Sequence, residues 1–392
     1  MSGIPLRSGN RSQSISDILK ALVNLSHHYG ADPEFVLAGG GNTSYKDAEY
    51  LYVKASGHIL ATIEANGFVR IERKKLDGIW QKKYPDDTEK REEEALADLM
   101  ASRVAGEEKR PSVETLMHGF FPQAYVVHTH PSMANGITCG KGGKDAVARL
   151  FPGKAIWIPV VNPGYVLANT VRNAMITFKA ETGKDCRIVF LENHGIVIAG
   201  ETPEEVDAVT ADVFARLRTE IHRYPDFSPV RADGERAAAV AGRIERLGGA
   251  ERPVVLFETN TEVLRFLKNQ KSFSPVSSSF SPDHIVYYGH EPLYVDATGG
   301  TEALFDAVEA GWKDYAARNG QPPRIIAVRG LGYFASGTNA RTATNSRLLF
   351  LDAIKVACYA ESFGGASFMP KDKVDFIRNW EVEKFRSSIS AK

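Results

Sequence analysis

Apolar and polar positions along the chain follow two different periods. Short apolar runs bounded by Gly, Pro or polar residues are typical of strands, and apolar positions three or four residues apart are typical of helices. Strands are expected at 35–38, 50–54, 67–71, 125–130, 155–161, 187–191 and 195–200. Helices are expected from Ile15 onward, within the charged stretch 82–110, and from Thr202 to about residue 223. The interleaving of the two patterns predicts an α/β protein.

The pattern also predicts how the chain divides. We expect a flexible segment at 1–14, an α/β domain at 15–225, a linker or bridging helix at 226–252 and a C-terminal α/β extension at 253–392.

One stretch of the extension is similar in sequence to a stretch of the first domain. Residues 324–337 overlay residues 187–200 without a gap, from an arginine through an apolar strand to a glycine, and Leu331 falls where His194 stands. Two interpretations stay open. The extension can be a degenerate repeat that lacks the histidine, or two ordinary strand–turn–strand–helix units can resemble each other by chance.

Candidate metal-binding histidines lie at the ends of two apolar runs. His128 and His130 close the run that begins at Tyr125, and side chains two apart on a strand point the same way. A second run ends in His194, and Glu114 precedes the pair. Imidazole and carboxylate groups are common ligands of zinc and similar ions. The four residues predict a catalytic metal centre; the competing interpretation is a hydrogen-bonded histidine pair on a half-buried strand.

Glycines and small polar residues follow two other expected strands. Glycine permits close backbone approach, and neighbouring amides and hydroxyls can cradle an anion. The residues expected to do so are Gly41, Asn42, Thr43, Ser56, Gly57 and Ser112. Ser112 is also expected to cap a helix on which Glu114 and His118 share a face. The competing interpretation is a tight turn; neither nucleotide-binding glycine motif fits the sequence.

Charge and cysteine content narrow the function classes. Lys and Arg together number 48, as do Asp and Glu, so no overall field favours nucleic acid or an anionic membrane. The 3 cysteines have no CxxC spacing, which fits free thiols in a reducing compartment. The first 16 residues contain no apolar core of a secretion signal, and no run is long enough to span a membrane. A cytoplasmic protein is expected.

Several short motifs together resemble the class II aldolase/adducin family. In chain order they are Gly-Gly-Asn-Thr-Ser at 40–44, Lys-Ala-Ser-Gly at 54–57, Ser112 with Glu114, Val-His-Thr-His at 127–130, and Glu-Asn-His-Gly at 192–195. The resemblance covers roughly residues 15–225 and is nearest to the aldolase part of rhamnulose-1-phosphate aldolase/dehydrogenase proteins. It implies an αβα fold around a mainly antiparallel sheet, a homo-oligomer, usually a tetramer, and a divalent metal, most often Zn²⁺. No dehydrogenase segment follows, so that second activity is expected to be absent.

The resemblance also implies roles for single residues. His128, His130 and His194 would bind the metal, and Glu114 would bind it at rest or act as a base. Asn42, Ser56, Gly57 and Ser112 would hold a phosphate. Members of the family often use a tyrosine as general acid, and Tyr165 is the substitute that this sequence offers. The expected reaction is reversible retro-aldol cleavage of a ketose phosphate to dihydroxyacetone phosphate and an aldehyde.

Three other functions remain open at this point. A sugar-phosphate 4-epimerase or a decarboxylase of the same family would use the same kind of metal site. A non-catalytic, adducin-like module would not need the three histidines and Glu114. A cupin-type oxygenase would place its glutamate after the HxH pair, whereas Glu114 precedes His128.

Overall fold

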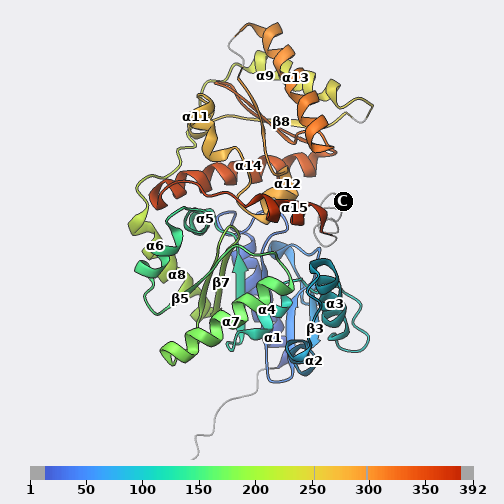
Figure 1. Ribbon diagram of the computed structural model, residues 1–392, viewed down its shortest axis with the longest axis vertical. Coiled ribbons are helices and arrows are strands. Elements are labelled where there is room, and N and C mark those ends of the chain that lie inside the picture. Colours follow the sequence, from blue (N-terminus) through green and yellow to red (C-terminus); the bar gives the residue numbers. More distant parts are fainter. Residues whose placement is uncertain (1–13, 251, 297–298, 381–392) are drawn as a thin grey trace, which may run out of the picture.

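The computed structural model describes residues 14–250, 252–296 and 299–380, which form two α/β units stacked along the long axis (Figure 1). The segment expected to be flexible, 1–14, lies outside the described residues except for Ser14, which caps the first helix through a bond from the Asp17 amide. None of the described helices combines the length and apolar composition that a bilayer span requires.

The first unit contains a seven-stranded sheet within the described residues, in the order β3-β2-β1-β4-β7-β6-β5. Its strands are β1 (Asn42–Lys46), β2 (Tyr50–Lys54), β3 (Phe68–Glu72), β4 (Tyr125–Thr129), β5 (Ala155–Ile158), β6 (Ile188–Leu191) and β7 (Gly195–Gly200). Neighbouring strands run antiparallel except β5 and β6, which are parallel. The prediction of a mainly antiparallel sheet is confirmed.

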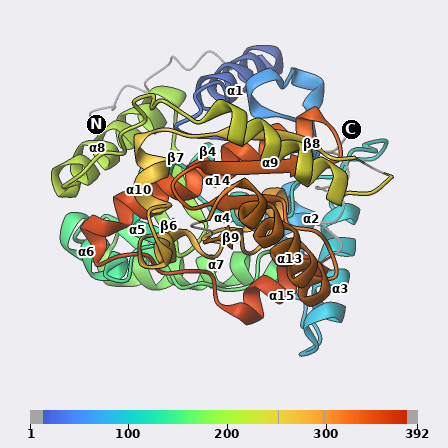
Figure 2. The same cartoon turned by 90° about the horizontal axis from the view of Figure 1, so that it is seen from above.

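Helices cover both faces of this sheet, as an αβα fold requires. On one face lie α2 (Arg73–Gly78), α3 (Thr88–Ala101), α4 (Thr115–Phe120) and α7 (Tyr165–Thr182). On the other lie α1 (Ile15–Gly30), α5 (Ser132–Thr138), α6 (Gly143–Leu150) and α8 (Pro203–Glu220). Figure 2 shows α1 and α8 on the opposite side of the molecule from α7, α2 and α3. Each face therefore has its own apolar core.

Two predicted strands differ from the structure. Residues 35–38 form turns, in which the Phe35 and Val36 amides both donate to the Asp32 carbonyl. Ala38 has a φ of 50°, which a strand does not allow. The strand expected at 155–161 ends at Ile158, and Pro159 follows it. Turn formation outweighs the apolar pattern at 35–38, and at 159–161 the chain continues after Ile158 without a strand or a turn.

The second unit contains a four-stranded sheet within the described residues, in the order β8-β11-β10-β9. Its strands are β8 (Val254–Glu258), β9 (Leu293–Val295), β10 (Ile325–Val328) and β11 (Gly332–Gly337). Its helices are α9 (Gly234–Leu247), α10 (Thr261–Phe266), α11 (Gln270–Phe273), α12 (Pro282–Tyr288), α13 (Thr301–Asn319), α14 (Ala340–Ala360) and α15 (Lys371–Asn379). Short 3₁₀ turns occur in both units. The first unit contains η1 (Leu60–Thr62), η2 (Ala65–Gly67) and η3 (Ile79–Gln81), and the second contains η4 (Ser274–Val276) and η5 (Glu361–Phe363).

The segment expected as a linker or bridging helix, 226–252, contains α9. Val240 and Ile244 of this helix are fully buried against the second sheet and α13. Helices α9 and α13 cover the outer face of the second sheet, and α14 lies between that sheet and the first unit (Figure 1). The second sheet is therefore also covered on both faces.

The sequence similarity between residues 187–200 and 324–337 corresponds to a repeat in the structure. The run β5-α7-β6-β7-α8 recurs as β9-α13-β10-β11-α14, with the same parallel and antiparallel pairings. Helices α7 and α13 both end at a glycine with a φ of 69°, Gly183 and Gly320. In the turns that follow, Asn193 (φ 53°) matches Gly330 (φ 65°) at the same spacing. The extension is thus a structural repeat of half of the first unit.

Candidate metal centre and anion pocket

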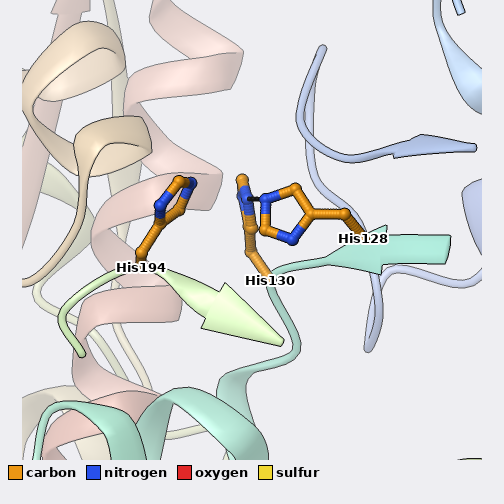
Figure 3. A group of neighbouring side chains, drawn as sticks. All are labelled: His128, His130 and His194. Atoms are coloured by element: carbon orange, nitrogen blue, oxygen red, sulfur yellow. Dashed lines mark hydrogen bonds between the residues drawn. The ribbon is translucent and has the colours of Figure 1, made fainter. Parts of the chain in front are cut away.

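Strand β4 and the turn between β6 and β7 bring three histidines together (Figure 3). The candidate ligand atoms of His128, His130 and His194 all lie within 4.8 Å of one another. The Nε2 atoms of His128 and His130 are 2.9 Å apart. Both side chains come from β4 or its end and point the same way, as the two-residue period of a strand requires.

Glu114 completes the group from a different part of the chain. It is the first residue before α4, and its Oε1 atom lies 3.2 Å from His128 Nε2 and 3.3 Å from His194 Nε2. Its other oxygen, Oε2, accepts a 2.5 Å hydrogen bond from Asn42 Nδ2. Three imidazoles and one carboxylate around a small volume form a donor set that suits Zn²⁺ or a similar ion. The residues present fit a divalent metal.

Backbone geometry makes this close approach possible. A Cβ atom on Gly195 would lie 2.6 Å from His130 Cδ2 and 2.5 Å from the Thr129 carbonyl oxygen. Only glycine allows β7 to pass so close to the histidine pair. His128 is held from its other side, because its Nδ1 atom lies 3.0 Å from the Ile196 carbonyl oxygen and donates to it. Its Nε2 atom therefore faces the other ligands.

Burial and charge set the protonation of the group. Burial raises the pKa of Glu114, but the imidazoles of His128, His194 and His130 outweigh it, and the pKa lies well below its ordinary value. Burial lowers the pKa of His194 to about 3. For His128, burial lowers the pKa, but the Glu114 carboxylate outweighs this and raises it. Glu114 is thus held as a carboxylate, the form that can bind a metal or accept a proton.

A pocket opens beside the metal-binding group. Five of the six residues expected to cradle an anion line it, namely Gly41, Asn42, Ser56, Gly57 and Ser112. Ser112 Oγ accepts from the Glu114 amide at 3.3 Å and from Asn42 Nδ2 at 3.4 Å. Glu114, His130 and His194 line the same pocket, so the candidate anion site and the candidate metal site are continuous.

Two of the predicted site residues lie elsewhere. Thr43 points to the opposite face of β1, where its hydroxyl is 2.6 Å from the Ser26 hydroxyl, because neighbouring side chains on a strand alternate. The structure therefore does not bring the Thr43 side chain to the pocket. Tyr165 packs against Trp80 and Tyr84, with ring centroids 5.8 and 4.8 Å away, and is not among the residues that line the anion pocket. The structure does not bring it to the metal-binding group.

The sequence did not lead us to two residues that line the pocket or contact its histidines. Lys54, at the end of β2, lines the pocket and is almost fully buried, and a lysine at this place offers the cationic group that small polar residues lack. Its signal was present in the Lys-Ala-Ser-Gly motif at 54–57. Asp283 of the second unit contacts His130, with 2.5 Å between Oδ2 and Nδ1. Nothing in the local sequence around Asp283 points to the first unit.

The remaining motif residues shape the turn before His194. The Glu192 carboxylate accepts from the Val160 amide at 2.9 Å. Asn193 adopts a left-handed φ, and its Nδ2 donates to the Ser367 carbonyl at 2.8 Å. His118 lies below the site, fully buried, with Nδ1 2.7 Å from the Ser44 hydroxyl. Glu192 and Asn193 therefore bond to backbone groups, whereas His118 contacts the Ser44 side chain.

Comparison with known proteins agrees with this arrangement. Residues 20–213 match the family described as the class II aldolase and adducin N-terminal domain, and residues 231–386 match the aldolase class II second domain. The chain belongs to the class II aldolase/adducin family. Class II aldolases use a divalent metal, and the three histidines of this chain form a group that could hold one.

A curated relative of this chain is considerably longer. The chain is 27% identical to the uncharacterized oxidoreductase YuxG of Bacillus subtilis (strain 168), over 97% of this chain and 60% of that protein. The chain therefore spans about 60% of the length of this curated relative.

Solved structures match about half of the chain. The N-terminal class II aldolase domain of a conserved protein from Thermoplasma acidophilum is 29% identical and has a TM-score of 0.45, over 56% of this chain and 100% of that one. L-fuculose-1-phosphate aldolase from Thermus thermophilus is 14% identical and has a TM-score of 0.34, over 52% of this chain and 93% of that one.

Proposed function

We propose that the protein is a metal-dependent aldolase that reversibly cleaves a ketose 1-phosphate, of the rhamnulose 1-phosphate type, into dihydroxyacetone phosphate and an aldehyde. The observation that carries the proposal is the position of Glu114. Its Oε1 atom faces His128 and His194, while its carboxylate also lines the pocket that contains Lys54, Ser56, Gly57 and Ser112. The proposed base, the proposed metal ligands and the proposed anion-binding residues therefore border one space.

Lys54 and the surrounding amides and hydroxyls would hold the substrate phosphate. A buried ammonium group with neighbouring hydrogen-bond donors suits a dianion better than either feature alone. Holding the phosphate at one end of the pocket would place C2 and C3 of the substrate near Glu114 and the histidines. Such positioning accounts for much of the rate in reactions with little covalent chemistry from the protein.

Glu114 would move the proton at C3. In the condensation direction its Oε1 atom would remove the C3 proton of dihydroxyacetone phosphate, and in the cleavage direction it would return that proton. The hydrogen bond from Asn42 fixes the other carboxylate oxygen and so orients Oε1. When bound, a divalent ion would act as a Lewis acid that stabilises the negative charge of the enediolate. Zinc is the proposed ion because it prefers imidazole nitrogen and carboxylate oxygen.

The proposal leaves out Tyr165, because the structure does not bring it to the pocket. It includes a homotetramer, as the family resemblance implies, and a cytoplasmic location. The three cysteines are free and buried, which supports a reducing compartment.

The test is product analysis with the zinc-loaded protein. We expect ketose 1-phosphates, with rhamnulose and fuculose 1-phosphates in the first panel, to release dihydroxyacetone phosphate and an aldehyde that ¹H NMR detects. Chelated, metal-free protein is the control and should release neither. Inversion at C4 without cleavage would favour the epimerase, and carbon dioxide from a sugar acid would favour the decarboxylase. Purified protein without metal and without turnover would favour the adducin-like module.

A further inference from the structure

We infer that Asp283 of the second unit is the positioning residue for His130, so that the metal site of the first unit is completed by the repeat stacked on it. The inference rests on the proposed metal site. It extends that site by a residue that takes no ligand position and reaches the metal only through an imidazole.

The geometry separates the two nitrogens of His130. Nδ1 lies 2.5 Å from Asp283 Oδ2, while Nε2 lies 2.9 Å from the Nε2 atom of His128. The side chains are 10% and 5% exposed, so water scarcely competes for the contact. A carboxylate accepts only, so Nδ1 must carry the proton and donate it to Asp283. Nε2 is then left with its lone pair directed toward His128 and His194, as a metal ligand requires.

Asp283 is placed by the fold rather than by a flexible loop. It lies in the first turn of α12, which begins at Pro282 and is capped by the Ser281 hydroxyl. A Cβ atom on Gly40 would lie 2.7 Å from Asp283 Oδ2, so the glycine admits the carboxylate. One turn further along α12, the Tyr287 hydroxyl accepts a 3.1 Å hydrogen bond from the Gly39 amide. Helix α12 is thus attached to the glycine loop that borders the anion pocket.

His128 on β4 and His130 just after it differ in their supporting partner. His128 donates to a backbone carbonyl of its own sheet, that of Ile196, and this bond needs no second unit. His130 instead depends on a carboxylate from 153 residues further along the chain. A charged acceptor makes the imidazole a stronger donor to a metal than a neutral one does. The second unit therefore contributes to metal affinity as well as to packing.

Asp283 does not serve as a metal ligand in this arrangement. The carboxylate contacts the far side of the His130 ring from His128, so the imidazole stands between it and the other ligands. Its effect should consequently appear in how tightly the ion is held, with the number of ions per chain unchanged.

The experiment compares Asp283→Asn with Asp352→Asn. Both changes replace a buried carboxylate bonded to a histidine, because Asp352 Oδ2 lies 3.0 Å from His284 Nε2. Asp352 also accepts a bond from Ser132 of the first unit, so its variant loosens a contact between the units without touching His130. Zinc affinity of the full chain is measured by competition with a chromophoric chelator. Long-range ¹H–¹⁵N NMR of the zinc-loaded protein reports which nitrogen of His130 is protonated.

We expect Asp283→Asn to bind zinc about 10–100-fold more weakly than wild type, still at one ion per chain, and Asp352→Asn to bind within about twofold of wild type. The His130 Nδ1 proton signal should shift or disappear in the first variant only. Equal losses in both variants would show general loosening and overturn the inference, as would wild-type affinity in Asp283→Asn. Wild-type protein that binds no zinc would overturn the proposed metal site itself, and the role of Asp283 with it.

Discussion

The two sheets share an order of elements but differ at the ends of three strands. By strand pairing and spacing, Phe257, Thr259 and Leu331 of the second sheet take the positions of the three histidines in the first. Among the described residues, only the first sheet yields a group able to hold a metal. Matching strand positions therefore carry three histidines in one unit, and Phe257, Thr259 and Leu331, which cannot form such a group, in the other.

The repeat contains the same two backbone features as the first unit, a glycine at a close contact and a left-handed residue in the turn before it. A Cβ atom on Gly195 would meet the His130 ring, and one on Gly332 would lie 2.7 Å from the Phe257 ring. The left-handed turn residue before each is retained, as Asn193 in one unit and Gly330 in the other. Helix α12 of the repeat instead contacts His130 of the first unit through Asp283.

The largest expected effect is the loss of bound metal when a proposed metal ligand of the first sheet is substituted. His194→Ala removes an imidazole that shares Glu114 with His128, and we expect it to abolish most bound metal in elemental analysis. The matched control is Leu331→Ala, at the same place in the second sheet, which should lose packing but retain one ion. Stoichiometric metal that survives loss of any two of the three histidines would contradict the proposed centre.

The carboxylate should matter for chemistry more than for folding. Glu114→Gln is expected to keep the fold and much of the metal, yet to slow proton exchange at C3 of dihydroxyacetone phosphate by on the order of a hundredfold or more. Deuterium incorporation measured by NMR gives the rate. Glu192→Gln is the control, because an amide oxygen can still accept from the Val160 amide, and it should exchange nearly as fast as wild type. Wild-type exchange in Glu114→Gln would remove the base from the proposal.

Local patterns predicted the parts of the site that depend on one strand or one turn. The two-residue period placed His128 beside His130, and the motif order placed Asn42, Ser56 and Ser112 around one pocket. The same period, applied to β1, would have excluded Thr43, because it points away from Asn42. The error came from treating the glycine loop and the strand after it as one anion-binding segment.

Other parts depend on contacts that no local pattern records. The contact between Asp283 and His130 arises from the stacking of two units, and the sequence contains no signal for that stacking. Tyr165 follows the turn at 162–164 closely, but α7 begins at this residue and carries its ring toward Trp80 and Tyr84. Position in the sequence predicted proximity to the pocket, while the direction of the helix determined where the ring points.

Adding the missing ligand to the second sheet should destabilise it without creating a second site. Leu331 is 6% exposed within the core beneath α9 and α13. Replacing it with histidine would forfeit apolar burial of roughly 1.5–3 kcal/mol, because Phe257 and Thr259 offer the imidazole no metal partners. Urea unfolding measures the loss, and Leu331→Met, which keeps an apolar side chain, should stay closer to wild type. Two tightly bound ions per chain in the wild-type protein would contradict this account.

The smallest expected effect is a change in how the unfolding free energy depends on pH, and it comes from His118 of the first unit. Burial lowers the pKa of His118 to about 3, with a further contribution from His128. Its Nε2 is among the buried side-chain atoms without a hydrogen-bond partner in the described part of the chain. The unfolded chain takes up a proton near the ordinary pKa of 6.5, whereas the folded protein resists it. Stability should therefore fall as the pH drops below that value.

At roughly 1.4 kcal/mol for each pH unit, this histidine should cost about 2 kcal/mol of unfolding free energy between pH 7 and pH 5. His118→Asn can keep a bond to the Ser44 hydroxyl while removing the titrating group. Urea titrations at the two pH values should show a smaller pH dependence in this variant than in wild type. The control is His222→Asn, at an exposed histidine, which should leave the dependence as it is. An unchanged dependence in His118→Asn would mean that other groups set the acid sensitivity, and the first sheet would then carry no penalty for its buried histidine.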